Sequence, residues 1–407
     1  MKFSIDQNAV ILALSRALEF TVSGIGEHHS RVAVIAQKLA DELGLSKRDK
    51  TVLLYACLLH DAGISSFGEK GKLEEFDVVE GSDHAERGYR LLMSYPPLEE
   101  IAHVVRFHHD KWEGGNPSGL SKHEIPLLSG MVFLADRIDV LLEKDVYVLE
   151  QKKGVCESVN NYRGMYFRPD LVDCFNKLAL AESFWLDLAP ANAHNFLDRI
   201  VAEQDKVVVD VETLMNLGEV FATIIDDKSK FTQIHSRGVS SVATKTARMF
   251  GFSETEVLMM SLAGLLHDVG KLSIPDEILE KPGKLTEQEF DIIKQHTFYT
   301  FHILNNIKGF DEMSKWAAYH HERLDGTGYP FRIPGSDMSV GSRVMAVSDV
   351  FTALSEDRPY RKHLKKDKVI DILDKQVTGG ALDGKIVNIV KDSYDDVNEF
   401  FVRVRGN

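Results

Sequence analysis

Hydrophobic residues recur along most of the chain at the three- and four-residue spacing of amphipathic helices. The spacing is clearest in five segments: Arg31–Leu43, Val52–Leu59, Leu258–Leu266, Phe290–Ile303 and Val387–Val397. Alternating, strand-like patterns are nearly absent, and the β-branched run Lys206–Val211 is short. Glycine and proline gather at 114–119, 281–283 and 326–334, where we expect loops. The sequence therefore predicts an all-α fold.

The first half of the sequence is repeated in the second half, with the same uncommon residues in the same order. The dipeptide His60-Asp61 corresponds to His267-Asp268, and the pair His108-His109 corresponds to His320-His321. Single residues match as well: His29 with His235, His84 with His296, and Asp136 with Asp349. The repeat predicts two tandem helical bundle domains that arose by duplication, at residues 1–190 and 191–407.

The repeated residues are of metal-ligating types. In the second half they are His235, His267, Asp268, His296, His320, His321 and Asp349. Imidazole and carboxylate groups suit one or two divalent transition metals. Adjacent residues of a helix diverge by roughly 100°, so His267 can serve one ion while Asp268 bridges to a second. A single buried histidine is more often structural, but recurrence of the whole set in both halves favours a metal site.

Composition and charge narrow the setting. The chain has 407 residues, enough for two domains, and a net charge of −14, which argues against binding to duplex nucleic acid or an anionic membrane. The three cysteines, Cys57, Cys156 and Cys174, have no metal-site spacing. No apolar run reaches the length of a membrane span. We expect a cytoplasmic protein in a reducing compartment.

Three stretches of the second half carry a family resemblance. Residues 320–330 (HHERLDGTGYP) resemble the signature of the HD-GYP subfamily of HD-superfamily phosphohydrolases, and residues 267–271 and 357–361 match it too. The match covers roughly residues 206–407, and the chain resembles the tandem form of these bacterial enzymes, in which a degenerate copy precedes a complete one. The resemblance implies a phosphodiesterase that opens cyclic di-GMP or 3′3′-cyclic GMP-AMP to the linear dinucleotide by two-metal hydroxide attack.

The resemblance also assigns the metal ligands. It implies that His235, His267, Asp268 and Asp349 hold one metal, and that Asp268 bridges to a second metal held by His296, His320 and His321. Iron and manganese are the expected ions. Some family members recruit a third metal with a glutamate four residues before the first histidine, where this chain has Phe231. We therefore expect two metals.

Several cations are placed to meet the phosphate of a substrate. Lys271 lies three residues after Asp268, so we expect these two residues to be catalytic and Lys271 also to bind substrate. Arg358 and Arg361 match the family pattern, and arginine suits bidentate phosphate contact. Tyr329 is a further candidate for substrate binding. The loop Gly326–Pro330 is a candidate contact for protein partners.

The first half keeps its ligands but loses the other groups. Its candidate second metal site comprises His29, His60, Asp61, His84, His108, His109 and Asp136. Ile64 replaces Lys271, and Asp145 and Val148 replace the two arginines. We therefore expect no phosphodiesterase activity in the first half, but a structural, sensing or dimerising role. The whole protein is accordingly a candidate homodimer.

Three other functions stay open at this stage. A nucleotide phosphohydrolase of the wider HD superfamily is one, although the complete Gly-Tyr-Pro segment argues against it. A di-iron oxygenase on a related scaffold is another, but Lys271 with Arg358 favours phosphate chemistry. The third is a cyclic-dinucleotide receptor without turnover, against which the intact ligand set of the second half argues.

Overall fold

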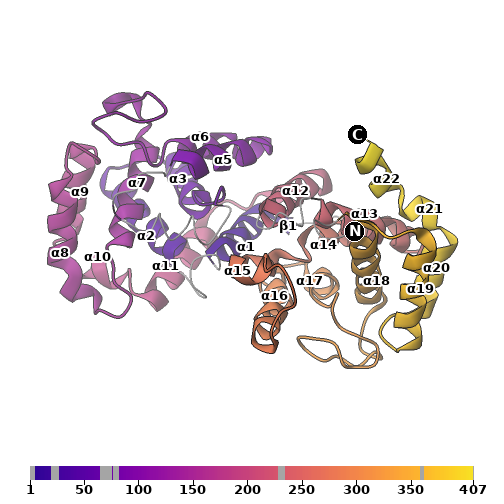
Figure 1. Cartoon of the computed structure of the whole chain (residues 1–407). Helices are drawn as coiled ribbons and strands as arrows, with labels where there is room; N and C mark the ends of the chain where they lie inside the picture. Colours follow the sequence, from indigo (N-terminus) through magenta and orange to yellow (C-terminus); the bar gives the residue numbers. More distant parts are fainter. Residues whose placement is uncertain are drawn as a thin grey trace. The chain divides into compact units, whose positions relative to one another are not determined.

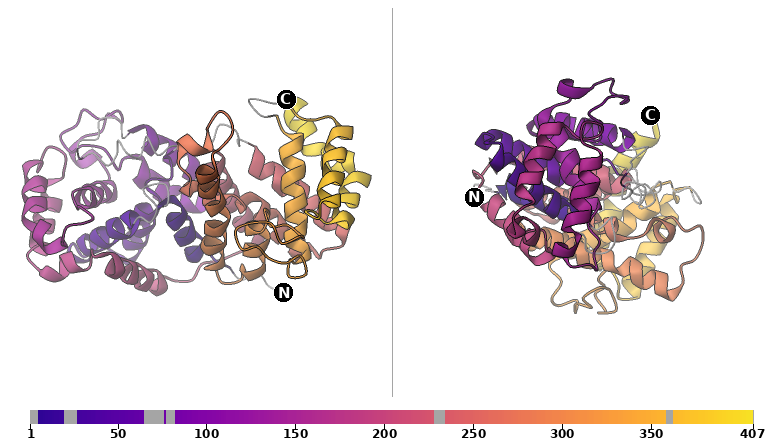
Figure 2. Two further views of the ribbon diagram at one scale, coloured as in Figure 1. Left: turned by 60° about the horizontal axis from the view of Figure 1, so that its bottom comes forward. Right: turned by 90° about the vertical axis from the view of Figure 1, so that its left-hand side faces the viewer.

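The computed structural model describes residues 5–19, 27–64, 76, 82–227, 234–357 and 362–406. Within these ranges helices joined by loops make up nearly all regular structure (Figures 1 and 2), so the all-α prediction is confirmed. The exception is a pair of two-residue antiparallel strands, β1 (Ile5–Asp6) and β2 (Val208–Val209). None of the described helices is both long and apolar enough to cross a membrane.

Two compact units divide the chain. The N-terminal unit is Leu18–Val207, and the C-terminal unit is Val208–Asn407 together with Met1–Ala17. This division differs from the predicted 1–190 and 191–407. Residues 190–203 form a helix that packs on the first long helix of the N-terminal unit, so the first unit extends further than predicted. Pairing of β1 with β2 places the start of the chain in the other unit.

The N-terminal unit is built from helices that follow α1 (Gln7–Glu19). They are α2 (His28–Glu42), α3 (Lys47–Leu59), α5 (Ser82–Met93), η2 (Pro96–Leu98), α6 (Glu99–Arg106), η3 (Lys122–Glu124), α7 (Leu127–Val140), α8 (Val148–Asn161), α9 (Pro169–Leu178), α10 (Glu182–Leu186) and α11 (Pro190–Glu203).

The helices of the C-terminal unit follow one another from α12 to α22. They are α12 (Val211–Asp227), α13 (His235–Phe250), α14 (Glu254–Leu266), η4 (Val269–Ser273), α15 (Asp276–Leu279), α16 (Glu287–Asn305), α17 (Asp311–Ala318), α18 (Val340–Ser355), α19 (Lys366–Thr378), α20 (Gly384–Asp392), α21 (Tyr394–Val397) and α22 (Glu399–Gly406). The predicted helix Val387–Val397 is therefore interrupted, because the backbone of Ser393 leaves the helical region.

Equivalent helices pack in the same pairs within each unit. Helix α2 contacts α3 and α7, and α13 contacts α14 and α18; α5 contacts α6, as α16 contacts α17. At the α13–α14 crossing a Cβ on Gly264 would lie 2.5 Å from the Cα of Ser240, so only glycine allows this approach. These shared packings bring the histidines and aspartates of each copy to one place.

Candidate metal centre and active site

Five helices of the C-terminal unit contribute the predicted ligands. His235 is the first residue of α13, while His267 and Asp268 directly follow α14. His296 lies in the middle of α16, His320 and His321 follow α17, and Asp349 lies on α18. The side chains converge in two groups whose ligand atoms lie within 4.8 Å of one another: His235 with His267 and Asp268, and His296 with His320 and His321.

The carboxylate of Asp268 faces the histidines of both groups. Its Oδ2 is 3.1 Å from His267 Nε2 and 3.7 Å from His235 Nε2. Its Oδ1 is 3.5 Å from His296 Nε2 and 3.8 Å from His320 Nε2. One carboxylate oxygen therefore faces each histidine group, which is the arrangement that a bridging ligand requires.

Asp349 lies across the site from Asp268. Its Oδ1 is 3.3 Å from His235 Nε2, and its Oδ2 is 3.9 Å from His321 Nδ1. All the ligands are buried except His321, whose side chain is 32% exposed. A cation here is enclosed by nitrogen and carboxylate oxygen atoms and stays accessible from the side of His321.

Backbone carbonyls fix the histidine tautomers. Nδ1 of His267 lies 2.8 Å from Gly264 O, that of His296 2.6 Å from Ile293 O, and that of His320 2.7 Å from Ala317 O. A carbonyl oxygen only accepts, so each Nδ1 carries the proton and donates it. Each Nε2 consequently presents a lone pair to the site, as a metal ligand must.

The atoms left facing the site fit a cation. The Nε2 atoms of His296 and His320 lie 3.3 Å apart, and with both tautomers fixed neither has a proton to share. His267 Nε2 and Asp268 Oδ1 are buried and have no hydrogen-bond partner among the described residues. Unsatisfied buried acceptors are costly. A divalent ion bound here would satisfy all of them.

Protonation equilibria point the same way. Burial lowers the pKa of His296 to about 3, which keeps this imidazole neutral and ready to ligate. Burial also opposes protonation of His235, but the Glu356 and Asp349 carboxylates outweigh it and raise the pKa to about 10. The site therefore demands positive charge near His235, and a metal ion competes with the proton for that place.

Glu356 contacts the candidate site, although the sequence pattern did not single it out. Its Oε2 lies 3.1 Å from His235 Nδ1, and the residue is 3% exposed. It thus holds the ring so that Nε2 faces Asp349. A signal existed, because Glu356 follows Asp349 by seven residues, two helical turns, and so shares its helix face.

Lys271 lies beside the carboxylate of Asp268. Its Nζ is 2.5 Å from Asp268 Oδ2, and its side chain is 21% exposed. The short helix η4 carries it there. Burial opposes ionisation of Asp268, but His267 and Lys271 outweigh it and hold the pKa of this carboxyl well below its usual range.

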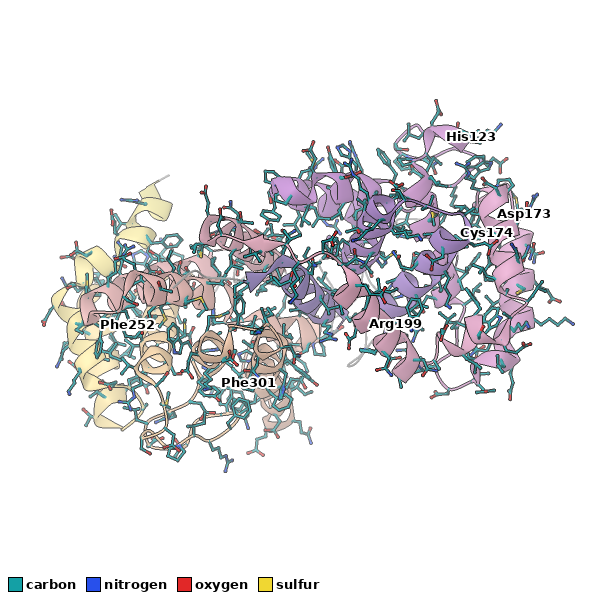
Figure 3. The ribbon with its side chains drawn as sticks, turned by 180° about the vertical axis from the view of Figure 1, so that it is seen from behind. His123, Asp173, Cys174, Arg199, Phe252 and Phe301 are labelled. Atoms are coloured by element: carbon teal, nitrogen blue, oxygen red, sulfur yellow. The ribbon has the colours of Figure 1, made fainter. Side chains whose placement is uncertain are left out.

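The loop after His321 is ordered by a second missed residue, Glu322. This buried carboxylate accepts hydrogen bonds from the backbone N–H groups of Phe331, Arg332 and Ile333 at 2.7–3.1 Å. Phe301, labelled in Figure 3, packs edge-on against Phe331 with ring centroids 5.5 Å apart.

Tyr329 lies in this loop, beside the open face of the site. Its ring centroid is 4.9 Å from that of His321, and its backbone N–H bonds to His321 O. Gly328 has to be glycine, because a Cβ would lie 2.4 Å from Glu322 Cα. The predicted residues Arg358 and Arg361, and Phe231, lie outside the described residues.

The N-terminal unit gathers its predicted ligands in the same way. His60 Nε2 lies 3.4 Å from Asp61 Oδ1, and His84 Nε2 lies 3.2 Å from His108 Nε2. Two groups again form: His28, His29, His60 and Asp61, and His84, His108 and His109. His28 was not predicted, because His29 matches His235 in the sequence. The structure places His28 Nε2 3.5 Å from Asp136 Oδ1, as His235 lies against Asp349.

Comparison with known proteins agrees with this duplicated architecture. Profiles of the HD domain match residues 25–141 and residues 219–386. The chain is therefore a tandem HD-domain protein with a His/Asp metal-ligand set in each unit.

Relatives of known function define the family. The chain is 30% identical to 3′3′-cGAMP-specific phosphodiesterase 1 of Vibrio cholerae, over 96% of this chain and 92% of that protein. It is 37% identical to a cyclic di-GMP phosphodiesterase of Thermotoga maritima over 36% of this chain and 41% of that protein. A crystal structure of a cyclic GMP-AMP-specific phosphodiesterase of V. cholerae has the same fold, with a TM-score of 0.69 and 24% identity over 96% of this chain and 98% of that one. The chain belongs to the HD-GYP family of metal-dependent phosphodiesterases.

Proposed function

We propose that the C-terminal unit hydrolyses 3′3′-cyclic GMP-AMP, in preference to cyclic di-GMP, to the linear dinucleotide. The metal centre with Lys271 against its bridging carboxylate is the observation that supports phosphodiester hydrolysis. The substrate preference is supported by the share of this chain that each relative matches. The relative that acts on 3′3′-cGAMP matches 96% of the chain, whereas the cyclic di-GMP phosphodiesterase of T. maritima matches 36%.

Two divalent ions are part of the proposal. His235, His267, Asp268 and Asp349 would hold one, and His296, His320 and His321 would hold the other, with Asp268 shared. The donor set of imidazole and carboxylate without thiolate suits iron or manganese. When bound, such ions lower the pKa of water and stabilise charge on a phosphate.

The chain's own residues orient and neutralise the substrate. The ammonium group of Lys271 lies 2.5 Å from Asp268 Oδ2, so it would be near a phosphate bound at the metal centre and could donate to a phosphate oxygen or to the departing 3′ oxygen. Tyr329 lies beside His321 at the accessible side of the site and is our candidate for contact with the nucleotide. Arg358 and Arg361 remain proposed phosphate ligands on the strength of the motif alone.

The test is anaerobic turnover of both cyclic dinucleotides with metal analysis of the same sample. We expect linear product from both, a higher kcat/KM for 3′3′-cyclic GMP-AMP, and iron or manganese in the active fraction. Equal or reversed preference would remove the substrate assignment. Binding of either ligand without turnover by the metal-loaded protein would identify a receptor instead.

We also propose the Gly326–Pro330 loop as a contact for protein partners and the N-terminal unit as the basis of a homodimer. Loop residues Gly326 and Thr327 lie at a turn outside the ligand set, so Thr327→Arg should block a partner without lowering basal turnover. Sedimentation over a range of concentrations would measure whether the whole chain dimerises. A chain that lacks Leu18–Val207 should then stay monomeric.

A further inference from the structure

The two metal-ligand sets differ at the aspartate of the last core helix. In the C-terminal unit the second oxygen of Asp349 faces a histidine, His321 Nδ1, at 3.9 Å. In the N-terminal unit the second oxygen of Asp136 accepts two hydrogen bonds from Arg137, at 3.2 Å from Nε and 2.8 Å from the terminal nitrogen. The residue after Asp349 is Val350, so only one copy carries this guanidinium.

Arg137 is enclosed within the site. It is 1% exposed, and its charge is permanent at any working pH. His109 and Arg137 lie in the wall of the same cavity as Asp136, so a fixed positive charge lies beside the side chains that would hold a second metal cation, and it repels such a cation.

The other half of the N-terminal ligand set is intact. His28 Nε2 lies 3.2 Å from His60 Nε2, 3.7 Å from Asp61 Oδ2 and 3.5 Å from Asp136 Oδ1. Nδ1 of His60 donates to Cys57 O at 2.8 Å, so its Nε2 offers a lone pair. Two histidines and two aspartates thus lie together here, as His235, His267, Asp268 and Asp349 do in the C-terminal unit.

A second carboxylate orients His28. Asp139 Oδ2 lies 2.7 Å from His28 Nδ1, and the same carboxylate is bonded by Arg31. Asp139 thus orients the ring of His28 as Glu356 orients the ring of His235, although the sequence repeat does not align Asp139 with Glu356.

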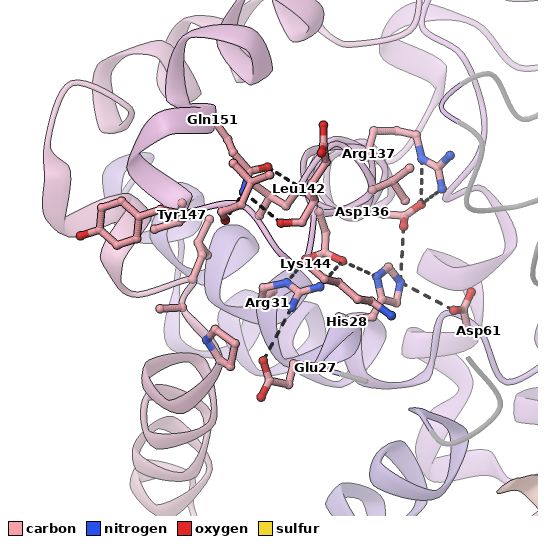
Figure 4. Close-up of a pocket in the computed structure, with 18 of the residues that line it drawn as sticks. Glu27, His28, Arg31, Asp61, Asp136, Arg137, Leu142, Lys144, Tyr147 and Gln151 are labelled. Carbon is pink, nitrogen blue, oxygen red and sulfur yellow. Dashed lines mark hydrogen bonds and ion pairs between the residues drawn. The ribbon is translucent and has the colours of Figure 1, made fainter. Parts of the chain in front are cut away.

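A cavity of about 560 Å³ gives access to this position. His28, Asp61 and Asp136 lie in its wall, together with Arg31 and Arg137 (Figure 4). Gln151 holds the loop at its rim by bonding to the backbone of Glu143 and Val146. An ion therefore has an entry path to the site, as metal binding requires.

We propose that the N-terminal unit holds one divalent transition-metal ion, among His28, His60, Asp61 and Asp136, and that the Arg137 guanidinium takes the place of a second. This site goes beyond the proposed activity of the C-terminal unit. It lacks the second ion, and Ile64 stands where Lys271 stands, so it binds metal without hydrolysing a phosphodiester.

The first test counts metal with Mn²⁺ as the only added ligand. The full chain carries His267→Ala, Asp268→Ala and His296→Ala to disable the C-terminal centre. We expect about one bound equivalent with the electron paramagnetic resonance spectrum of an isolated Mn²⁺. Adding His28→Ala and Asp61→Ala should abolish it, and adding His109→Ala should leave it. No bound manganese in the disabled chain, or its loss with His109→Ala, would overturn the proposal.

The second test addresses Arg137 itself. Arg137→Val introduces the valine that follows Asp349 in the other unit. In the chain with the disabled C-terminal centre, this change should raise bound manganese to about two equivalents and give a spin-coupled spectrum. Arg163→Val is the matched control, since Arg163 is an exposed arginine paired with Asp173 in the same unit. Circular dichroism checks folding of each variant. Binding of two manganese equivalents while Arg137 is present would contradict the role of Arg137. If Arg137→Val does not fold, retention or loss of manganese in His109→Ala decides whether the proposal stands.

Discussion

At the scale of residues, the chemistry of the C-terminal site depends on how neighbours orient a few side chains. Asp268 faces both histidine groups, and backbone carbonyls or Glu356 set the direction of the rings that surround it. Three predictions concern single side chains that act on this arrangement or on the burial of charge.

Lys271→Ala should impair turnover more than metal content, because we propose that Lys271 contacts the phosphate and its charge makes it a poor metal ligand. Removing a charge-assisted contact costs about 1.5–3 kcal/mol, which corresponds to a roughly ten- to hundredfold lower kcat/KM. Lys315→Ala is the control, since Lys315 forms the same three-residue-spaced ion pair, with Glu312, on the surface. A parallel loss of metal and activity would refute the assigned role.

Glu356→Ala should weaken metal binding, because His235 loses the partner of its Nδ1. Loss of such a supporting contact typically lowers metal affinity about 10- to 100-fold. Titration with Mn²⁺ measures this, and Glu356→Gln, which keeps an acceptor, should recover part of the affinity. Glu312→Ala, an exposed glutamate, serves as the control. Unchanged affinity in Glu356→Ala would show that Asp349 alone orients the ring.

Glu19→Gln should change the pH dependence of stability. Burial raises the pKa of Glu19 to about 7 in the folded protein, above its ordinary value of 4.5. Between pH 4.5 and 7 the unfolded chain therefore loses its proton first, and the folded state loses stability as pH rises. The uncharged glutamine side chain should thus stabilise by about 1–3 kcal/mol at pH 8 and by much less at pH 4.5, measured by urea unfolding. An equal effect at both pH values would contradict the raised pKa.

At the scale of elements, the sequence pattern located the helices well and their ends less well. Side-chain caps explain several starts: Ser253 bonds to Glu256 at α14, and Thr286 bonds to Glu289 at α16. Close packing between elements explains why glycine is required at particular positions, where the sequence pattern alone indicates only the end of a helix.

Gly270→Ala should destabilise the C-terminal unit and disturb its metal site. A Cβ at Gly270 would lie 1.9 Å from the carbonyl oxygen of His296, so η4 and α16 would have to separate. Overpacking of this kind costs about 1–3 kcal/mol or more. Gly154→Ala in α8 is the matched control, because open space surrounds Gly154 and alanine favours a helix by about 0.5–1 kcal/mol. Thermal melts of both variants compare the two effects, and a neutral Gly270→Ala would show that the crossing can relax.

At the scale of the whole molecule, the duplication separates a complete copy from a degenerate one. Both units assemble two groups of candidate metal ligands, but Lys271 beside Asp268 in the C-terminal unit corresponds to Ile64 in the N-terminal unit. The division of labour between the units is therefore open to a paired experiment in the full-length chain.

His60→Ala with Asp61→Ala should leave most of the activity, whereas His267→Ala with Asp268→Ala should abolish it. The N-terminal unit lacks the lysine and both motif arginines, and Asp145 adds charge of the wrong sign for a phosphate. Loss of several charged contacts costs orders of magnitude in rate even when the effects are not additive. If the first pair abolishes turnover while the protein stays folded with its C-terminal metals bound, the N-terminal unit is catalytic or an essential partner.

The sequence by itself determined the all-α class, the duplication and the identity of most residues that line both sites. It could do so because helical spacing and the order of histidines and aspartates are local properties of the chain. The tertiary structure alone decided which neighbours orient those residues. His28 rather than its neighbour takes the place against Asp136, Glu356 reaches His235, and Arg137 enters a metal-ligand set.

The unit boundary was also decided only by tertiary structure. Residues 5–6 pair with residues 208–209, although the sequence of the whole N-terminal unit separates the two segments. No local pattern records such a contact, because its energy comes from two segments that are far apart in the sequence and meet only in the folded chain. The same reason accounts for the orienting residues: side-chain direction depends on how helices cross, and spacing along one helix does not contain that information.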